Sequence, residues 1–207
     1  MKLALLILLG VVAGFVNVMA GGGSTLTMPF LIFMGLDSAT ANGTNRAAVF
    51  FQNVAAVTKF HKEELYDFSI VIRYAVWTLP GAVLGALTAV RITDALFQKI
   101  LGVVIVGVMV TVLFPADPER ATERTSHRRL IYPALLLIGF YAGFIQAGVG
   151  FLLIAAMIHI LRLNMVQANK HKVFIILFNS LPALLVFAFS KNVHYAYAAA
   201  LSAGNAL

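Results

Sequence analysis

Residues 9–20 read LGVVAGFVNVMA, and residues 138–147 read IGFYAGFIQA. The matched pairs are Gly10 with Gly139, Ala13 with Ala142, Gly14 with Gly143, Phe15 with Phe144, and Asn17 with Gln146. The match continues downstream, where LDSATAN at 36–42 corresponds to LNMVQAN at 163–169 and Gln52-Asn53 corresponds to Asn179-Ser180. A match kept in register over this length predicts two copies of one sequence unit.

The composition is that of a membrane protein. Of 207 residues, 61% are hydrophobic and only 11% are charged, whereas a soluble domain is about half apolar and about a quarter charged. Several apolar stretches are long enough to cross a bilayer, which takes roughly 20 residues. We therefore predict an all-α, polytopic membrane protein, because the stretches are continuous rather than alternating like the strands of a β-barrel. The stretch 3–20 runs into glycines and a second apolar stretch, so we expect no cleavable signal peptide.

The formal charge of +7 comes from basic residues in short loops between apolar stretches. We interpret them as topology signals rather than as a nucleic-acid site. The loop 115–129 carries four arginines and is predicted to be cytoplasmic. The chain then forms a single transmembrane domain, 1–207, with repeat one at 1–114 and repeat two at 130–207.

Two short apolar segments, 26–36 and 151–163, each follow a glycine cluster, at 21–23 and 148–150. Short, glycine-interrupted segments at corresponding places in two halves indicate a transporter site. We predict that each cluster is the tip of a broken helix hairpin, which keeps the cations of 162–172 in the cytoplasm. One hairpin plus three spans is an odd number of crossings. The second repeat is therefore predicted to be inverted relative to the first.

The second repeat is shorter than the first. Pro80-Gly81 corresponds to Ala203-Gly204, and nothing corresponds to 85–114. We therefore expect either that the native chain continues past Leu207 or that a partner fills the incomplete surface. A homo-oligomer is one such arrangement.

Several motifs resemble a known family. Gly14-Phe15-Val16-Asn17, AGGGS at 20–24, Met28-Pro29 and the segment 39–45 resemble the first repeat of the TauE/SafE family of sulfite exporters and sulfonate permeases. AGFIQAGVGF at 142–151 resembles the second glycine motif of that family. The resemblance runs from Leu9 to Gly204. It implies an inner-membrane permease or exporter for sulfite, organosulfonates or other small organic anions.

The glycine clusters are the centre of the predicted site. Helix N-termini carry about half a positive charge and free N–H donors, which suit an anion. The alternative is close helix packing, which also uses small residues. The repeat register favours the site, and the candidate substrate-binding residues are Asn17, Gly21, Gly22, Gly23, Ser24, Asn42, Thr44, Asn45, Arg46, Gln52, Asn53, Gln146, Gly148, Gly150, Asn169, Lys172 and Asn179.

Amides within apolar segments need a partner or a wet cavity, because an unsatisfied polar group in lipid costs several kcal/mol. Repeat symmetry favours two pairs, Asn17 with Gln146 and Gln52 with Asn179, as site-lining. The alternative is that these amides make interhelical hydrogen bonds that hold the bundle together.

Three basic side chains complete the candidate site. Arg46 and Lys172 are candidate cations at the mouth of an anion pathway, and the alternative is snorkelling to lipid headgroups. His159 is the proton-relay candidate, and the alternative is a neutral packing histidine.

These observations favour a secondary transporter of small anions. The alternatives are a membrane-embedded interaction subunit, whose glycines serve packing alone, and an anion channel. No phosphate-binding loop, metal-binding motif or catalytic constellation is present in the sequence, so we expect neither an enzyme nor a cofactor. The expected partners are the anion, the lipid bilayer and a coupling proton or ion.

Overall fold

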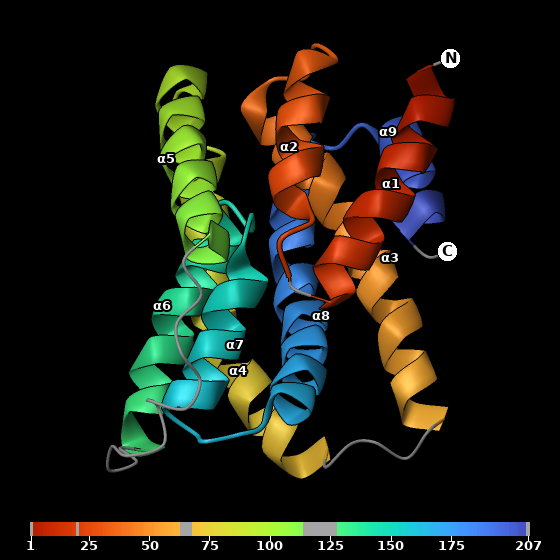
Figure 1. The fold of residues 1–207 in the computed structure, drawn as a ribbon. Helices are drawn as coiled ribbons and strands as arrows, with labels where there is room; N and C mark the ends of the chain where they lie inside the picture. The colour runs from red at the N-terminus through yellow and green to blue at the C-terminus, as the bar shows by residue number, and fades with distance from the viewer. Residues whose placement is uncertain (1, 20, 63–67, 114–127, 206–207) are drawn as a thin grey trace.

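A computed structural model describes residues 2–19, 21–62, 68–113 and 128–205. Every regular element in these ranges is helical (Figure 1): α1 Lys2–Met19, α2 Ser24–Phe33, α3 Ser38–Lys62, α4 Phe68–Ala89, α5 Asp94–Leu113, the 3-10 turn η2 Arg128–Leu130, α6 Ile131–Phe144, α7 Val149–His159, α8 Met165–Phe189 and α9 Tyr195–Asn205. Most of the predicted cytoplasmic loop 115–129 lies outside the described residues.

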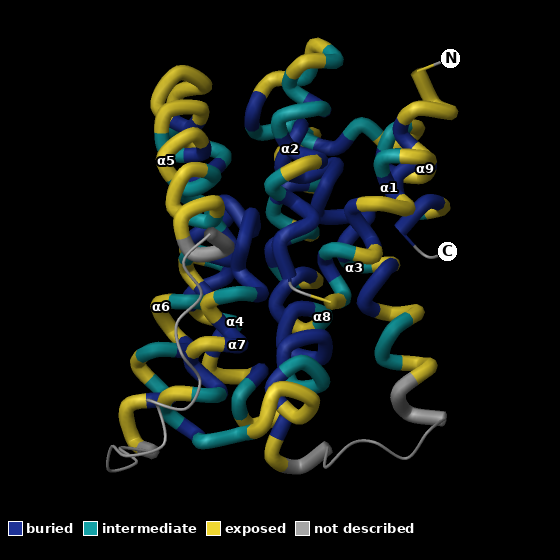
Figure 2. Tube along the Cα trace, viewed as in Figure 1, coloured by how far each residue is buried: buried dark blue, intermediate teal, exposed yellow. Residues whose placement is uncertain are grey.

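The surface of the bundle suits a bilayer. Three helical segments of the described chain, Lys2–Met19, Ile70–Ala89 and Met165–Phe189, are long and apolar enough to cross one. Large apolar side chains are exposed on the outside, including Phe33 at 89% and Phe189 at 84%, while the buried positions lie along the centre (Figure 2). The prediction of an all-helical polytopic membrane protein is confirmed.

Both predicted helix breaks are present. The chain between α1 and α2 contains Gly21 with φ +85°, and the chain between α6 and α7 contains Gly148 with φ +73°. This left-handed conformation favours glycine, because a Cβ atom there collides with the backbone. In Figure 1, α2 turns back beside α1 and α7 turns back beside α6, so each pair forms a hairpin.

The two hairpin tips touch each other. The backbone N–H of Gly150 donates to the carbonyl oxygen of Gly21, with 3.3 Å between nitrogen and oxygen. A Cβ atom on Gly21 would lie only 2.3 Å from the Cα of Gly150. The tips therefore meet at the centre of the bundle with no room for a side chain between them.

The helices that flank the tips also pack on glycines. Gly10 of α1 lies against Gly204 of α9, and Gly139 of α6 lies against Thr78 of α4. The first helix of each half thus packs on a helix of the other half, α1 on α9 and α6 on α4. The inverted relation of the repeats stays a prediction, and this packing is compatible with it.

The third helix starts earlier than its apolar stretch. The apolar stretch begins near Ala47, whereas α3 begins at Ser38. Two carboxylates fix this start: Oδ1 of Asp37 accepts from the N–H of Thr40 at 2.9 Å, and Oδ1 of Asp94 accepts from the N–H of Ser38 at 2.6 Å. Because the first turns of α3 face other helices rather than lipid, polar side chains can occupy them.

Candidate functional site

Buried polar side chains lie at and around the place where the two helix breaks meet. A set of them from both halves has at most 9% exposure: Asn17, Ser24, Thr27, Asn42, Thr44, Asn45, Arg46, Gln52, Asn53, Gln146, Lys172, Asn179 and Ser180. The described residues include two acidic side chains, Asp37 and Asp94, and both are exposed. The buried cations Arg46 and Lys172 therefore have no buried carboxylate near them in the described part of the chain.

Arg46 is completely buried and caps the C-terminal end of α6. Its Nη2 donates to the carbonyl oxygens of Ala142 and Gly143, each at 2.9 Å, and to Oδ1 of Asn42 at 3.3 Å. Its guanidinium carbon lies 5.2 Å from the ring centroid of Phe187. The last carbonyls of a helix carry partial negative charge, so a cation there is stabilising. The Nε and Nη1 atoms of Arg46 have no hydrogen-bond partner.

Lys172 caps the C-terminal end of α1 in the same way. Its Nζ donates to the carbonyl oxygens of Asn17 at 3.1 Å and Val18 at 2.8 Å. A cation of the second half thus covers a helix end of the first half, and Arg46 does the reverse. Both cations are buried, so neither snorkels to a lipid headgroup, and their role in an anion pathway stays a prediction. Helix carbonyls hold both cations inside the bundle.

We expect the variant Lys172→Met to lower the free energy of unfolding by about 2 kcal/mol. The reason is that the methionine leaves the last carbonyls of α1 without a charged donor. Chemical denaturation in detergent measures the loss. The matched control is Lys191→Met, because Lys191 is exposed just after α8. Equal stability of the two variants would contradict the capping role.

In the first half, two amides at the break make hydrogen bonds between helices. Nδ2 of Asn17 donates to Oε1 of Gln52 at 3.0 Å, and Nε2 of Gln52 donates to the carbonyl oxygen of Gly14 at 2.8 Å. These bonds tie α3 to the end of α1. The interhelical bonding that sequence analysis weighed as the alternative for these two amides is therefore present.

A second polar cluster ties α3 to the start of α2. Oδ1 of Asn45 accepts from the hydroxyl of Thr27 at 2.5 Å, and its Nδ2 donates to Oγ of Ser24 at 3.0 Å. One turn earlier, Nδ2 of Asn42 donates to the carbonyl oxygen of Phe144 at 2.7 Å. The polar first turns of α3 thus contact both helix breaks.

In the second half, the equivalent amide is bonded through its nitrogen alone. Nε2 of Gln146 donates to Oγ of Ser180 at 3.2 Å, while its buried Oε1 has no hydrogen-bond partner. Gln146 also has a left-handed backbone, with φ +60°. The two repeats are therefore chemically different at matched positions, because Asn17 is held by Gln52 and Gln146 is not held by Asn179.

Gln146 opens onto a narrow crevice between α4, α6, α7 and α8. The crevice is lined by Thr78, Ile138, Ala142, Gln146, Val149, Leu153, Ile175, Ile176 and Asn179. The space between these side chains is too narrow to hold a water molecule. Ala142 connects the crevice to the buried guanidinium, because its carbonyl oxygen accepts from Arg46.

The glycines of the two clusters pack tightly. A Cβ atom on Gly23 would lie 2.1 Å from the carbonyl oxygen of Ala13, and one on Gly22 would lie 2.6 Å from the ring of Phe151. Close packing and a role in binding are compatible, because both need a backbone that other groups can approach.

Four predicted residues lie away from the break or bond elsewhere. Oγ1 of Thr44 accepts from the N–H of His194 at 2.9 Å, and Nδ2 of Asn53 donates to a carbonyl of its own helix at 2.7 Å. Asn169 is partly buried, with an unpartnered Oδ1. His159 is exposed in the last turn of α7, at the end opposite the glycine tip. Its proton-relay role stays a prediction.

Three residues at the site were not predicted from the sequence. Thr27 lies one turn after Ser24, and that spacing could have placed it on the same helix face. Ser180 was noted only as a repeat match for Asn53. Phe187, the ring near Arg46, carried no signal, because a phenylalanine in an apolar helix usually faces lipid or core.

The chain is similar to several proteins named as probable membrane transporters. A probable membrane transporter protein of Haemophilus influenzae is 28% identical over 210 residues, which cover 99% of this chain and 81% of that protein. The probable membrane transporter protein YfcA of Escherichia coli K12 is 25% identical over 198 residues, covering 94% of this chain and 73% of that protein. A probable membrane transporter protein, ORF9, of a Sinorhizobium species is 26% identical over 192 residues, covering 90% and 72%.

No solved structure shows significant similarity to the chain. The family model described as sulfite exporter TauE/SafE matches residues 6–207. This match includes both glycine clusters, both buried cations and the amides around them. The integral membrane protein with two glycine-broken hairpins is thus a member of the sulfite exporter TauE/SafE family of membrane transporters.

Proposed function

We propose that the chain is a secondary transporter of small anions, with sulfite, organosulfonates or related organic acids as substrates. The observation that carries this proposal is Arg46, which is completely buried with two nitrogens unpartnered. A buried charge is costly unless a group of opposite charge pairs with it. Since the acidic side chains of the described residues are exposed, an anionic substrate is the natural partner.

The helix ends at the break support the same proposal. The N-terminal ends of α2 and α7 start at the glycine tips, and such ends favour negative charge. The C-terminal ends of α1 and α6 would repel an anion, but Lys172 and Arg46 cover their carbonyls. The balance of charge at the break is therefore positive, without a bound ion.

The closed crevice favours a transporter over the alternative of an anion channel. A channel needs a continuous wet path, whereas the space beside Gln146 is too narrow for water. In this proposal the substrate reaches the site only when the hairpins move. As part of this proposal, the protein lies in a bacterial inner membrane and catalyses no reaction. A proton or another ion is its coupling partner.

We expect purified protein in proteoliposomes to take up labelled sulfite, or one of taurine, sulfolactate and pyruvate, with saturable kinetics. Saturation follows because each transport cycle occupies a single site. Imposed proton and sodium gradients identify the coupling ion, and choline serves as a cationic control. A conductance that does not saturate would favour a channel. Absence of uptake and binding for all these anions would favour an interaction subunit.

A further inference from the structure

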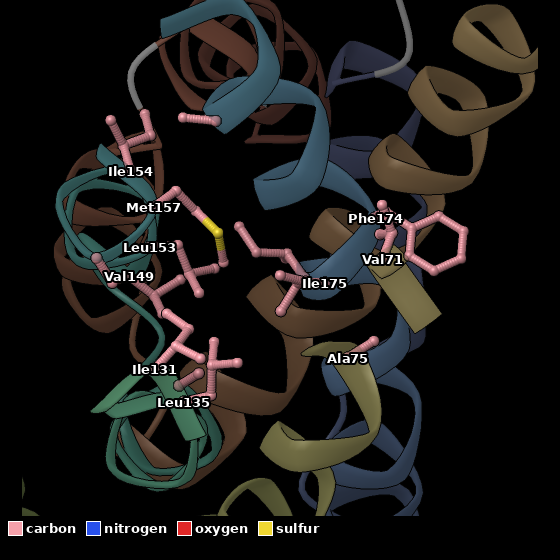
Figure 3. Packing of buried hydrophobic residues seen from close by; sticks show 14 of the residues in the cluster. Val71, Ala75, Ile131, Leu135, Val149, Leu153, Ile154, Met157, Phe174 and Ile175 are labelled. Atoms are coloured by element: carbon pink, nitrogen blue, oxygen red, sulfur yellow. The ribbon is translucent and has the colours of Figure 1, made fainter. Parts of the chain in front are cut away.

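The side chains of the crevice beside the α6–α7 break suit the carbon chain of an organic anion, in addition to the charge that Arg46 would recognise. Its walls are mainly apolar and include Val149, and Leu153 and Ile175 point toward the same space (Figure 3). Inorganic oxyanions such as sulfite have no aliphatic chain to fill such a space. An aliphatic chain on the substrate would gain the burial that these side chains offer.

One polar atom in this apolar crevice is left without a partner. Gln146 is 2% exposed and its Oε1 accepts no hydrogen bond. An unpaired buried acceptor is uncommon in folded proteins and calls for an explanation. Turning the carboxamide over would leave its NH₂ group unpaired instead. A hydroxyl group satisfies either end, because it both donates and accepts.

The backbone of Gln146 points to the same role. Its φ of +60° is unusual for a residue with a side chain. Such strained positions persist where the surrounding structure enforces them, and they cluster at binding sites. Its repeat counterpart Asn17 lies in regular helix, with its amide bonded to Gln52.

We propose that Gln146 and this crevice select a short organic anion that carries a hydroxyl group on its carbon chain. The inference rests on the proposed anion transport and adds the class of substrate. The crevice is too narrow for water in this structure, so it must widen as the hairpins move; its apolar walls then contact the methylene groups, and the free end of the Gln146 amide bonds the hydroxyl. The anionic group is left to the positive charge of Arg46, whose Nη2 bonds the crevice residue Ala142.

The experiment compares pairs of anions that differ by hydroxyl against methyl. One pair is 2-hydroxyethanesulfonate and 1-propanesulfonate, and the other is hydroxyacetate and propanoate, so that both acid groups are covered. In proteoliposomes, we expect the wild type to prefer the hydroxyl member of at least one pair by about tenfold in kcat/KM, because the methyl analogue leaves a buried amide unpaired.

Two variants test the amide. Gln146→Met keeps the length of the side chain and removes the amide, so the preference should fall to about one. Gln146→Asn tolerates the left-handed backbone well and shortens the reach of the amide, so it gives the same readout if the methionine variant does not fold. The matched control is Gln98→Met, the same change at an exposed position of α5, in which the preference should persist.

A third variant tests the walls. Ile175→Phe fills the crevice, so uptake of the organic anions should fall about tenfold or more while sulfite uptake persists. Equal rates within both pairs for the wild type, a preference retained in both Gln146 variants, or unchanged organic uptake in Ile175→Phe would each overturn the inference. In those cases sulfite uptake would leave anion transport standing. Uptake of neither sulfite nor any organic anion would overturn both proposals.

Discussion

Replacing Arg46 with leucine should reduce anion uptake about 100-fold. The buried guanidinium is the only cation of the described site with unpartnered nitrogens, and it offers them in surroundings that exclude water. Removing one partner of a buried, hydrogen-bonded charge pair costs about 3 kcal/mol, which corresponds to about two orders of magnitude in affinity. Uptake of labelled sulfite, with binding measured by calorimetry on the folded variant, gives the number.

The design must separate binding from capping, because Arg46 also covers the end of α6. Arg46→Lys keeps a cation, and Lys172 is an example of an ammonium that caps a helix end in this fold. We expect Arg46→Lys to keep most of the stability and to bind anions weakly, since its few donors go to the carbonyls. Arg91→Leu is the control, because Arg91 is exposed after α4. Unchanged anion affinity in a folded Arg46→Leu variant would assign Arg46 to capping alone.

Much of the fold could be predicted from the sequence, because the internal repeat marks corresponding elements in the two halves. Matched glycines identified the two helix breaks, and the structure places Gly21 and Gly148 in the same left-handed conformation. The start of α3 could not be predicted from apolar periodicity. Its first turns are polar, and side chains of distant residues, such as Asp94, fix where it begins.

The sequence named the buried polar residues around the helix breaks but not their hydrogen bonds, and their role in binding stays a prediction. Sequence matching pairs Asn17 with Gln146 and treats them as equal. The structure separates them, because Gln52 is long enough to bond Asn17 while Gln146 bonds Ser180. In the same way, the sequence placed Arg46 and Lys172 near the site without showing which carbonyls they bind. Those partners lie far away in the sequence, at 142–143 and 17–18.

Adding one methyl group at the meeting point of the hairpins should disrupt the whole centre. In Gly21→Ala the new Cβ would lie 2.3 Å from the Cα of Gly150, so backbone must move. The alanine must also adopt φ +85°, which costs about 1–2 kcal/mol for a residue with a Cβ atom. Overpacking adds about 1–3 kcal/mol. We expect the free energy of unfolding to fall by about 3 kcal/mol and anion uptake to be lost.

Gly150→Ala separates the two causes. Its Cβ would lie 2.2 Å from the Cα of Gly21, so the steric collision is the same. Gly150 is in regular helix with no positive φ, so this variant has no backbone strain from a left-handed conformation. We expect a loss of about 2 kcal/mol, less than for Gly21→Ala. The matched control is Gly102→Ala in α5, where no atom lies within 4 Å of the new Cβ; since alanine is the better helix former, its stability should hold or rise. Denaturation in detergent ranks the three variants, and a Gly21→Ala protein as stable and active as Gly102→Ala would show that the hairpin tips need not meet.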